Sequence, residues 1–231
     1  MDRKALAAAF PVTLPVLMGY LAIGIAFGLM LQEIGYNFIW AFFMSLTIYA
    51  GSGQYLGVTL LSTAAGLGTV AVMTLLINFR HLVYGLSMLE KFRGMGWRKL
   101  YMIFSLTDET YSVLCGMDEV PAGVDKNGAM FLVALLDQLY WVAGSLLGTF
   151  AGGLPLDFTG IDFSMTALFL VIFLEQWRGA KSHLPALLGL CCAGVFLLVL
   201  GADNFLLPAL CTTVAVLLLA RPVLNREKEA A

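Results

Sequence analysis

Residues 11–31 contain no Asp, Glu, Lys or Arg and form the first of several long apolar segments in the chain. A transmembrane helix needs about 20 predominantly apolar residues, so this segment is long enough to cross a lipid bilayer. The hydrophobic content of 60% and the mean hydropathy of +0.89 exceed what a soluble domain carries. These features predict an all-α integral membrane protein that sits in a lipid bilayer.

Charge and cysteine content argue against other classes of ligand. The formal net charge of -2 leaves no basic surface for nucleic acid. The four cysteines lie in apolar segments, without Cys-x-x-Cys spacing or a nearby His, so we interpret them as reduced packing residues. We expect no metal site and no cofactor. An Ala-x-Ala site lies only ahead of the first apolar segment, so that segment is expected to remain as a membrane helix.

The second apolar segment, residues 38–62, is interrupted in its middle by Ala-Gly-Ser-Gly-Gln over residues 50–54. Two glycines around a serine favour a helix that stops and restarts. The restart leaves free backbone N–H groups that could bind an anion, such as the carboxylate of an amino acid. The alternative is a crossing point where small residues let two helices approach closely.

Two adjacent carboxylates, Asp108 and Glu109, lie in the apolar run of residues 100–116. A carboxylate at the centre of a bilayer costs roughly 2.5–3.5 kcal/mol, and two ionised neighbours repel each other. Folding alone gives no reason for this placement, so the pair indicates function.

The third apolar segment, residues 66–89, carries Asn78, Arg80 and His81 at its centre, with Tyr84 one turn further on. An arginine at that depth needs a carboxylate, backbone carbonyls or a water-filled cavity. Asp108 and Glu109 are the natural candidates for its partner. His81 alone would be interpreted as a packing residue, but its polar neighbours favour a functional role.

Further spans are predicted at about residues 129–150, 161–177, 184–201 and 205–219. If 38–62 and 100–116 are re-entrant, the chain has six full spans plus two interrupted segments. Both termini, residues 1–10 and 220–231, are then cytoplasmic, and every Lys and Arg except Arg80 lies on that side. The alternative of seven to eight full spans moves the loop of residues 91–99 outside. Both arrangements describe one transporter domain over 1–231, in the inner (cytoplasmic) membrane.

Small residues recur at helical spacing in two of the predicted spans. Gly24 and Gly28 share one face of the first, and Gly144, Gly148 and Gly152 share a face of the one predicted at about residues 129–150. Such faces permit close helix contact. Internal packing is the more common use, and docking of a partner subunit is the alternative. In the same predicted span of residues 129–150, Asp137 with Gln138 either adds to a polar pathway or marks a solvated helix end.

Three motifs, YAGSGQY over 49–55, NFRHLVYGLS over 78–87 and LTDETY over 106–111, resemble those of the AzlC family in order and separation. The resemblance covers about residues 10–219, with Gly53 and Phe79 as small departures. It implies the large subunit of an exporter of branched-chain amino acids (leucine, isoleucine, valine or analogues), driven by the proton gradient. It also implies a small AzlD-type membrane subunit as a partner.

Residue pattern and resemblance together define a hypothetical site. Gly51, Ser52 and Gly53 bind the substrate carboxylate through backbone N–H groups, with Gln54 assisting. Asp108 or Glu109 faces the substrate ammonium and titrates, while Arg80 holds the other carboxylate ionised. The remaining members of the site are the substrate-facing Tyr84 and the orienting residues Asn78, His81 and Thr107.

Two other classes of function remain open from the sequence. The first is an intramembrane serine protease that would use Ser52 and His81, which leaves Arg80 and the two carboxylates without a role. The second is a passive channel or an accessory scaffold. No nucleotide-binding loop is present in the sequence. We predict a transporter and no enzyme.

Overall fold

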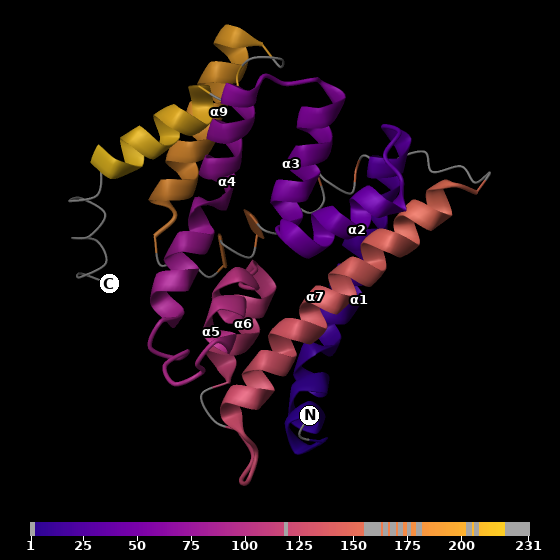
Figure 1. Ribbon diagram of the computed structural model, residues 1–231. Helices are drawn as coiled ribbons and strands as arrows, with labels where there is room; N and C mark the ends of the chain where they lie inside the picture. The colour runs from indigo at the N-terminus through magenta and orange to yellow at the C-terminus, as the bar shows by residue number, and fades with distance from the viewer. Residues whose placement is uncertain are drawn as a thin grey trace. The chain divides into compact units, whose positions relative to one another are not determined.

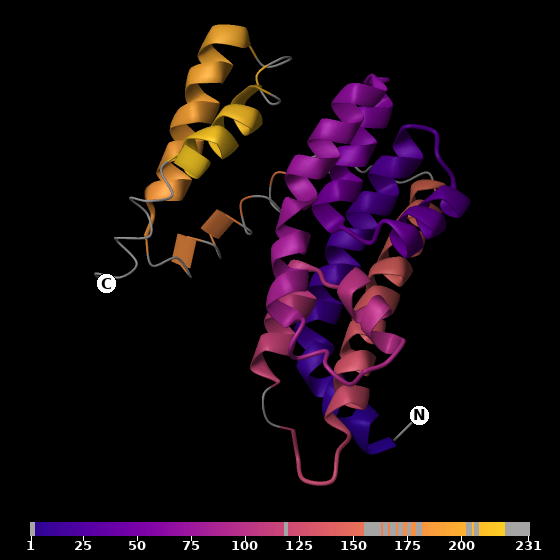
Figure 2. The ribbon, with the colours of Figure 1, turned by 60° about the vertical axis from the view of Figure 1, so that its left-hand side comes forward.

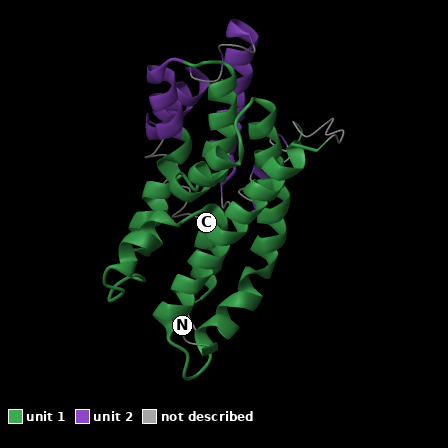
Figure 3. Ribbon diagram, turned by 45° about the vertical axis from the view of Figure 1, so that its right-hand side comes forward, with its two compact units in different colours: residues 1–65, 77–165 green, residues 66–76, 166–231 purple. Residues whose placement is uncertain are grey.

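The computed structural model describes residues 3–117, 120–154, 163, 166, 170, 173–174, 177–178, 182–201, 205 and 208–219. Within these residues the chain forms helices and no strands, which confirms the all-α prediction. It divides into two compact units (Figure 3): residues 1–65 with 77–165, and residues 66–76 with 166–231. Most of the predicted span 161–177 and the tail 220–231 lie outside the described residues.

Three helices of the described part are long and apolar enough to cross a membrane: α1 (Arg3–Glu33), α4 (Leu67–Met88) and α7 (Lys126–Gly152). Shorter apolar helices are α2 (Phe38–Thr47), α9 (Leu184–Leu200) and Pro208–Leu219. In the second unit, Gly189 of α9 approaches the side chain of Thr213. The number of spans and the side on which each terminus lies stay predictions.

In the first unit, α1 and α7 lie side by side (Figures 1 and 2). Their backbones approach so closely that a Cβ atom on Gly28 would lie 2.1 Å from the carbonyl oxygen of Ser145. A Cβ on Gly148 would lie 2.0 Å from the carbonyl oxygen of Ile25. The two glycine faces therefore pack against each other, as the internal-packing interpretation predicts. The chain itself occupies the surface that was the alternative docking face for a small subunit.

The second apolar segment is broken as predicted. α2 ends at Thr47 and α3 (Gly51–Ser62) begins four residues later, so Gly51, Ser52 and Gly53 form the first turn of a new helix. Tyr49, inside the break, has a φ of +43°. This left-handed conformation is costly for a bulky residue and marks a sharp change in chain direction.

The predicted run 100–116 is also interrupted, by residues 105–107. α5 (Arg98–Phe104) has 7 residues and α6 (Asp108–Gly116) has 9. At about 1.5 Å per residue, neither helix can cross a hydrocarbon core of ~30 Å by itself. The side chain of Thr107 caps α6 by accepting a hydrogen bond from the backbone N–H of Thr110.

An apolar cluster fills one end of the first unit, below the start of α6. Its buried members come from α1, the end of α4, α5, α6 and α7 and from the connecting chain between them, and include Phe92, Met102, Leu106, Leu114 and Met130. Leu106 is 1% exposed, and the polar residues that follow it directly begin the site. The cluster thus fixes the position of the α6 N-terminus.

Candidate functional site

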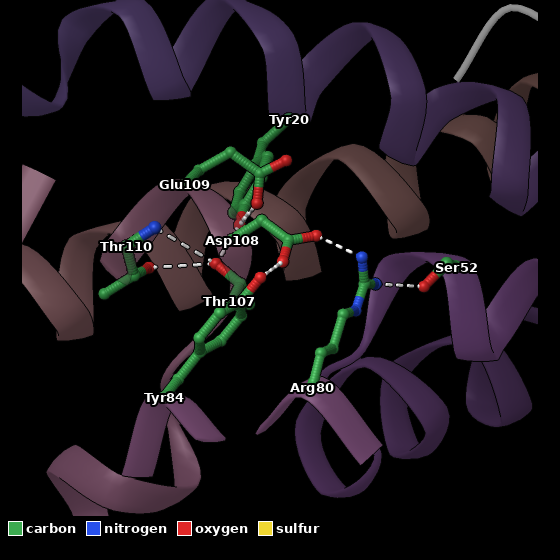
Figure 4. Close-up of polar contacts among 8 residues, drawn as sticks. All are labelled: Tyr20, Ser52, Arg80, Tyr84, Thr107, Asp108, Glu109 and Thr110. Carbon is green, nitrogen blue, oxygen red and sulfur yellow. Dashed lines mark hydrogen bonds and ion pairs between the residues drawn. The ribbon is translucent and has the colours of Figure 1, made fainter. Parts of the chain in front are cut away.

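Arg80 of α4 joins two helix starts. Its guanidinium forms an ion pair with Oδ2 of Asp108 at the start of α6 and donates to Oγ of Ser52 in the first turn of α3 (Figure 4). The side chains of Arg80 and Asp108 are 26% and 20% exposed. This contact confirms that a carboxylate of the Asp108–Glu109 pair is the partner of Arg80. It also brings together three segments that the sequence predicts to carry function.

Asp108 uses both of its carboxylate oxygens. Oδ1 accepts a hydrogen bond from the hydroxyl of Tyr84 at 2.6 Å, while Oδ2 faces Arg80. The ring of Tyr84 stacks on that of Tyr111 with centroids 4.5 Å apart. The position of Asp108 at a helix N-terminus adds the favourable field of the helix dipole. Asp108 thus accepts a hydrogen bond at one carboxylate oxygen and pairs with a cation at the other.

Glu109 has a different environment from its neighbour. Its Oε2 accepts a hydrogen bond from the hydroxyl of Tyr20 at 2.8 Å. The same Tyr20 oxygen, which comes from α1, lies 2.5 Å from Oγ1 of Thr107. Figure 4 shows the two carboxylates directed to different partners, Asp108 to Arg80 and Glu109 to Tyr20. One of the adjacent acids is thus paired with a cation and the other with neutral hydroxyls.

Asp137 of α7 is a further member of the polar cluster. It is 0% exposed, which excludes the interpretation as a solvated helix end. Its Oδ2 accepts a hydrogen bond from Oγ1 of Thr110 at 2.8 Å, and its Oδ1 is buried without a partner. The hydroxyl of Tyr49 is likewise buried and unpartnered. Sequence reasoning did not place Thr110, Tyr20 or Tyr49 in the site, although Thr110 and Tyr49 lie within two of the three motifs, and the Asp137–Gln138 pair also gave a signal.

The start of α3 is packed rather than capped by a side chain. Its N-cap, Ala50, has no side-chain cap. A Cβ on Gly51 would lie 3.2 Å from the ring of Trp141, and one on Gly53 would lie 3.2 Å from the side-chain amide of Asn78. The glycines therefore let the first turn of α3 approach α7 and α4 closely, while the hydroxyl of Ser52 reaches Arg80.

Gln54 and His81 lie around this first turn. Gln54 is fully buried, donates to Oγ of Ser45 at 3.1 Å and accepts from the indole N–H of Trp141 at 2.8 Å. Both ends of its amide are therefore engaged within the protein. His81 packs edge-on against Tyr84 with ring centroids 6.1 Å apart, whereas the hydroxyl of Ser52 is bonded to Arg80. The described contacts thus do not join Ser52 and His81 in a dyad.

The fold and site define a helical membrane protein in which an arginine on one long helix links the starts of two short ones. A sequence model described as "AzlC protein" matches residues 15–154. The chain is 42% identical over 223 residues to the "Branched-chain amino acid transport protein AzlC" of Bacillus subtilis, covering 96% of this chain and 87% of that protein.

Two other relatives are membrane proteins by description. One from Helicobacter pylori is 42% identical over 96% of this chain and 97% of its own length. The "Inner membrane protein YgaZ" of Escherichia coli is 26% identical over 74% of this chain and 72% of its own. No solved structure matches the chain. The chain belongs to the AzlC family, as its three motifs predict.

Proposed function

We propose that this chain is the large subunit of a secondary active exporter of branched-chain amino acids, coupled to protons, in the inner membrane. Family membership and the Bacillus subtilis relative, described as a branched-chain amino acid transport protein, support the substrate class. A small AzlD-type membrane subunit completes the transporter. In this proposal the chain catalyses no covalent reaction.

The observation that carries the proposal is the contact of Arg80 with both Ser52 and Asp108. An amino acid is a zwitterion, so its site must offer a positive and a negative group a few ångströms apart. The amides at the start of α3 and the guanidinium of Arg80 supply the positive side. Asp108 supplies the negative side, and the contact places all of these groups within one amino acid's reach.

Binding can then proceed by exchange of partners. In the described state, Arg80 and Asp108 neutralise each other. A substrate that inserts between them gives its carboxylate to Arg80 and the first turn of α3, and its ammonium to Asp108. Every charge keeps an opposite charge beside it, so the exchange avoids leaving an unpaired ion in a weakly hydrated site. Tyr84 and Asn78 flank this position, and His81 supports Tyr84.

Glu109 is the carboxyl group that can exchange the coupled proton. Asp108 is paired with Arg80, whereas Glu109 is bonded to a phenol and has no cationic partner among the described residues. Acidic side chains in membrane segments commonly serve as proton relays. Protonation and deprotonation of Glu109, directly next to Asp108, would change the local charge beside the substrate ammonium and couple the two fluxes.

Selection of the substrate side chain would depend on apolar contacts. Such contacts discriminate by only ~1–3 kcal/mol per methylene group. We therefore expect leucine, isoleucine, valine and close analogues to be carried with overlapping rates, and charged amino acids to be rejected.

The test is counterflow in proteoliposomes that contain this chain together with the small subunit encoded beside it. Leucine, isoleucine and valine should exchange, lysine and aspartate should not, and a protonophore should abolish accumulation against a gradient while exchange persists. Transport that does not respond to the protonophore and shows no saturation would favour the passive channel. Absence of any amino-acid flux would overturn the proposal.

A further inference from the structure

We propose that Glu109 shares one proton with the buried Asp137 through a chain of three hydroxyl groups. Asp137, at the buried end of this chain, is then a proton acceptor of the transporter. This inference depends on the proton coupling proposed above. It assigns a role to Asp137, Thr110 and Tyr20, none of which belongs to the substrate site.

The chain of hydroxyls is continuous from one carboxyl to the other. Glu109 Oε2 is 2.8 Å from Tyr20 Oη, which is 2.5 Å from Thr107 Oγ1. Thr107 Oγ1 is 3.1 Å from Thr110 Oγ1, and this oxygen is 2.8 Å from Asp137 Oδ2. All four contacts lie within hydrogen-bonding distance. Tyr20, Thr107 and Thr110 are each at most 6% exposed, so bulk water does not interrupt the path.

Counting hydrogens shows that the chain needs one proton more than its hydroxyls supply. There are four oxygen–oxygen contacts between the two carboxyl groups, and each requires one hydrogen. Three hydroxyl groups supply three, because each has a single donor hydrogen. When both acids are ionised, one contact holds two oxygens together with no hydrogen between them. A single proton on either Glu109 or Asp137 completes all four contacts.

The same geometry lets that proton change ends. If Glu109 is protonated, it donates to Tyr20, Tyr20 to Thr107, Thr107 to Thr110, and Thr110 to Asp137. When each hydroxyl passes its hydrogen forward and takes the one behind it, Asp137 gains a proton and Glu109 becomes a carboxylate. No atom other than hydrogen moves, and the net charge of the cluster is unchanged. The reverse shift restores the first state.

The surroundings of Asp137 suit a carboxyl group that can accept a proton and become neutral. The acid is 0% exposed, and no Lys, Arg or His among the described residues pairs with it. The titratable groups that face it are Glu109 of α6, Tyr49 after α2 and Tyr101 of α5, while Tyr20 of α1 lies along the hydroxyl chain. None of them is a cation. An isolated buried carboxylate is very costly, which favours a shared proton.

Asp137 has hydrogen-bonding capacity that is not used, and this supports a role as a proton carrier over a purely structural role. Among the described residues, Oδ1 of Asp137 and the hydroxyl of Tyr49 are both buried without a hydrogen-bond partner, and Tyr49 is 3% exposed. A metal ion is a poor alternative, because a hard cation takes about six oxygen ligands. The described residues contain no group of His, Cys, Asp and Glu that could hold a metal.

Infrared spectra of the native reconstituted transporter and of its variants test directly whether a carboxyl group holds the shared proton. At neutral pH we expect the carbonyl band of a protonated carboxylic acid, shifted in the single variants D137N and E109Q and absent from the double variant. The band should persist in D108N, because Asp108 is paired with Arg80. Absence of the band in the native protein, or its persistence in the double variant, would overturn the inference.

A matched pair at Thr110 tests the path. T110V removes the hydroxyl at nearly constant volume and should lower proton-driven transport roughly tenfold or more, whereas T110S retains a hydroxyl and should be close to native. Native proton-driven transport in T110V would refute the path and leave the proposed function intact. If the native protein shows no leucine counterflow, the proposed function is refuted instead.

Discussion

Arg80 on α4 and Asp108 at the start of α6 form an ion pair between two segments that are 28 residues apart in the chain. The pair is partly buried, and Ser52 and Tyr84 hold its two ends. Its partners thus come from the interrupted second segment, the third span and the interrupted acidic segment. Together, the contacts of Arg80 with Asp108 and with Ser52 connect the three motifs at residues 49–55, 78–87 and 106–111.

Loss of the carboxylate should stop transport without removing the protein from the membrane. D108N leaves Arg80 without its counter-charge and removes the proposed ammonium partner, so we expect leucine transport to fall by about 100-fold or more. Uptake into proteoliposomes measures this loss, and the amount of protein in the membrane is the control. Native transport by D108N would remove Asp108 from the mechanism.

The energetic coupling of the pair is measurable by a double-mutant cycle. R80Q and D108N should each lower the thermal stability of the detergent-solubilised protein, and the double variant should lose less than the sum of the two. We expect an interaction energy of about 1–3 kcal/mol for this partly exposed contact. Additive losses would show that the ion pair does not couple the two helices.

Contact between α1 and α7 should be sensitive to a single methyl group. A Cβ on Gly28 would meet the Ser145 carbonyl at 2.1 Å, and backbone atoms cannot move aside cheaply. G28A should therefore destabilise the protein by about 1–3 kcal/mol or more. G19A, in the same helix, has nothing within 4 Å of the new Cβ and is the matched control. Equal melting temperatures for the two variants would contradict the observed packing.

Two tyrosine hydroxyls in the polar cluster should differ in their contribution to stability. Tyr20 bonds to Glu109 and Thr107, so Y20F should cost about 1–2 kcal/mol. Tyr49 has a buried hydroxyl without a partner, so Y49F should leave stability unchanged or slightly raise it. Thermal unfolding of both variants makes the comparison. A larger loss of stability for Y49F than for Y20F would contradict the hydrogen bonding described for the two hydroxyls.

The side of the membrane on which residues 91–99 lie distinguishes the two topologies. Trp97 is 75% exposed and suits a reporter cysteine, placed in a variant whose four native cysteines are replaced by serine. The re-entrant arrangement predicts labelling of W97C only after the membrane is permeabilised. Labelling from outside intact cells would establish the alternative with more full spans.

The sequence predicts those parts of the site in which a residue type conflicts with a lipid environment. Arg80, Asp108 and the glycines around Ser52 stand out because a helix in a bilayer has no reason to contain them. Their partnership follows because a membrane-buried guanidinium needs a carboxylate. The break in the second segment follows from its two glycines, whereas an interruption of residues 100–116 is expected only from the re-entrant topology.

Other parts of the site depend on packing that the sequence does not reveal. A tyrosine or a threonine in an apolar helix is common, so nothing marks Tyr20, and only its place in the motif of residues 106–111 marks Thr110, until α1 and α7 are placed around α6. Asp137 could equally have been a solvated helix end by its sequence position. The glycine faces indicate close contact but not which helix makes it.

The glycine contact between α1 and α7 also bears on how such a protein could alternate between two openings. Because the backbones of these two helices touch at the glycines, we expect the two helices to move together as one rigid unit. In the proposed transporter, the rocking that exposes the substrate first to one side and then to the other would then come from the short, broken helices that meet at Arg80.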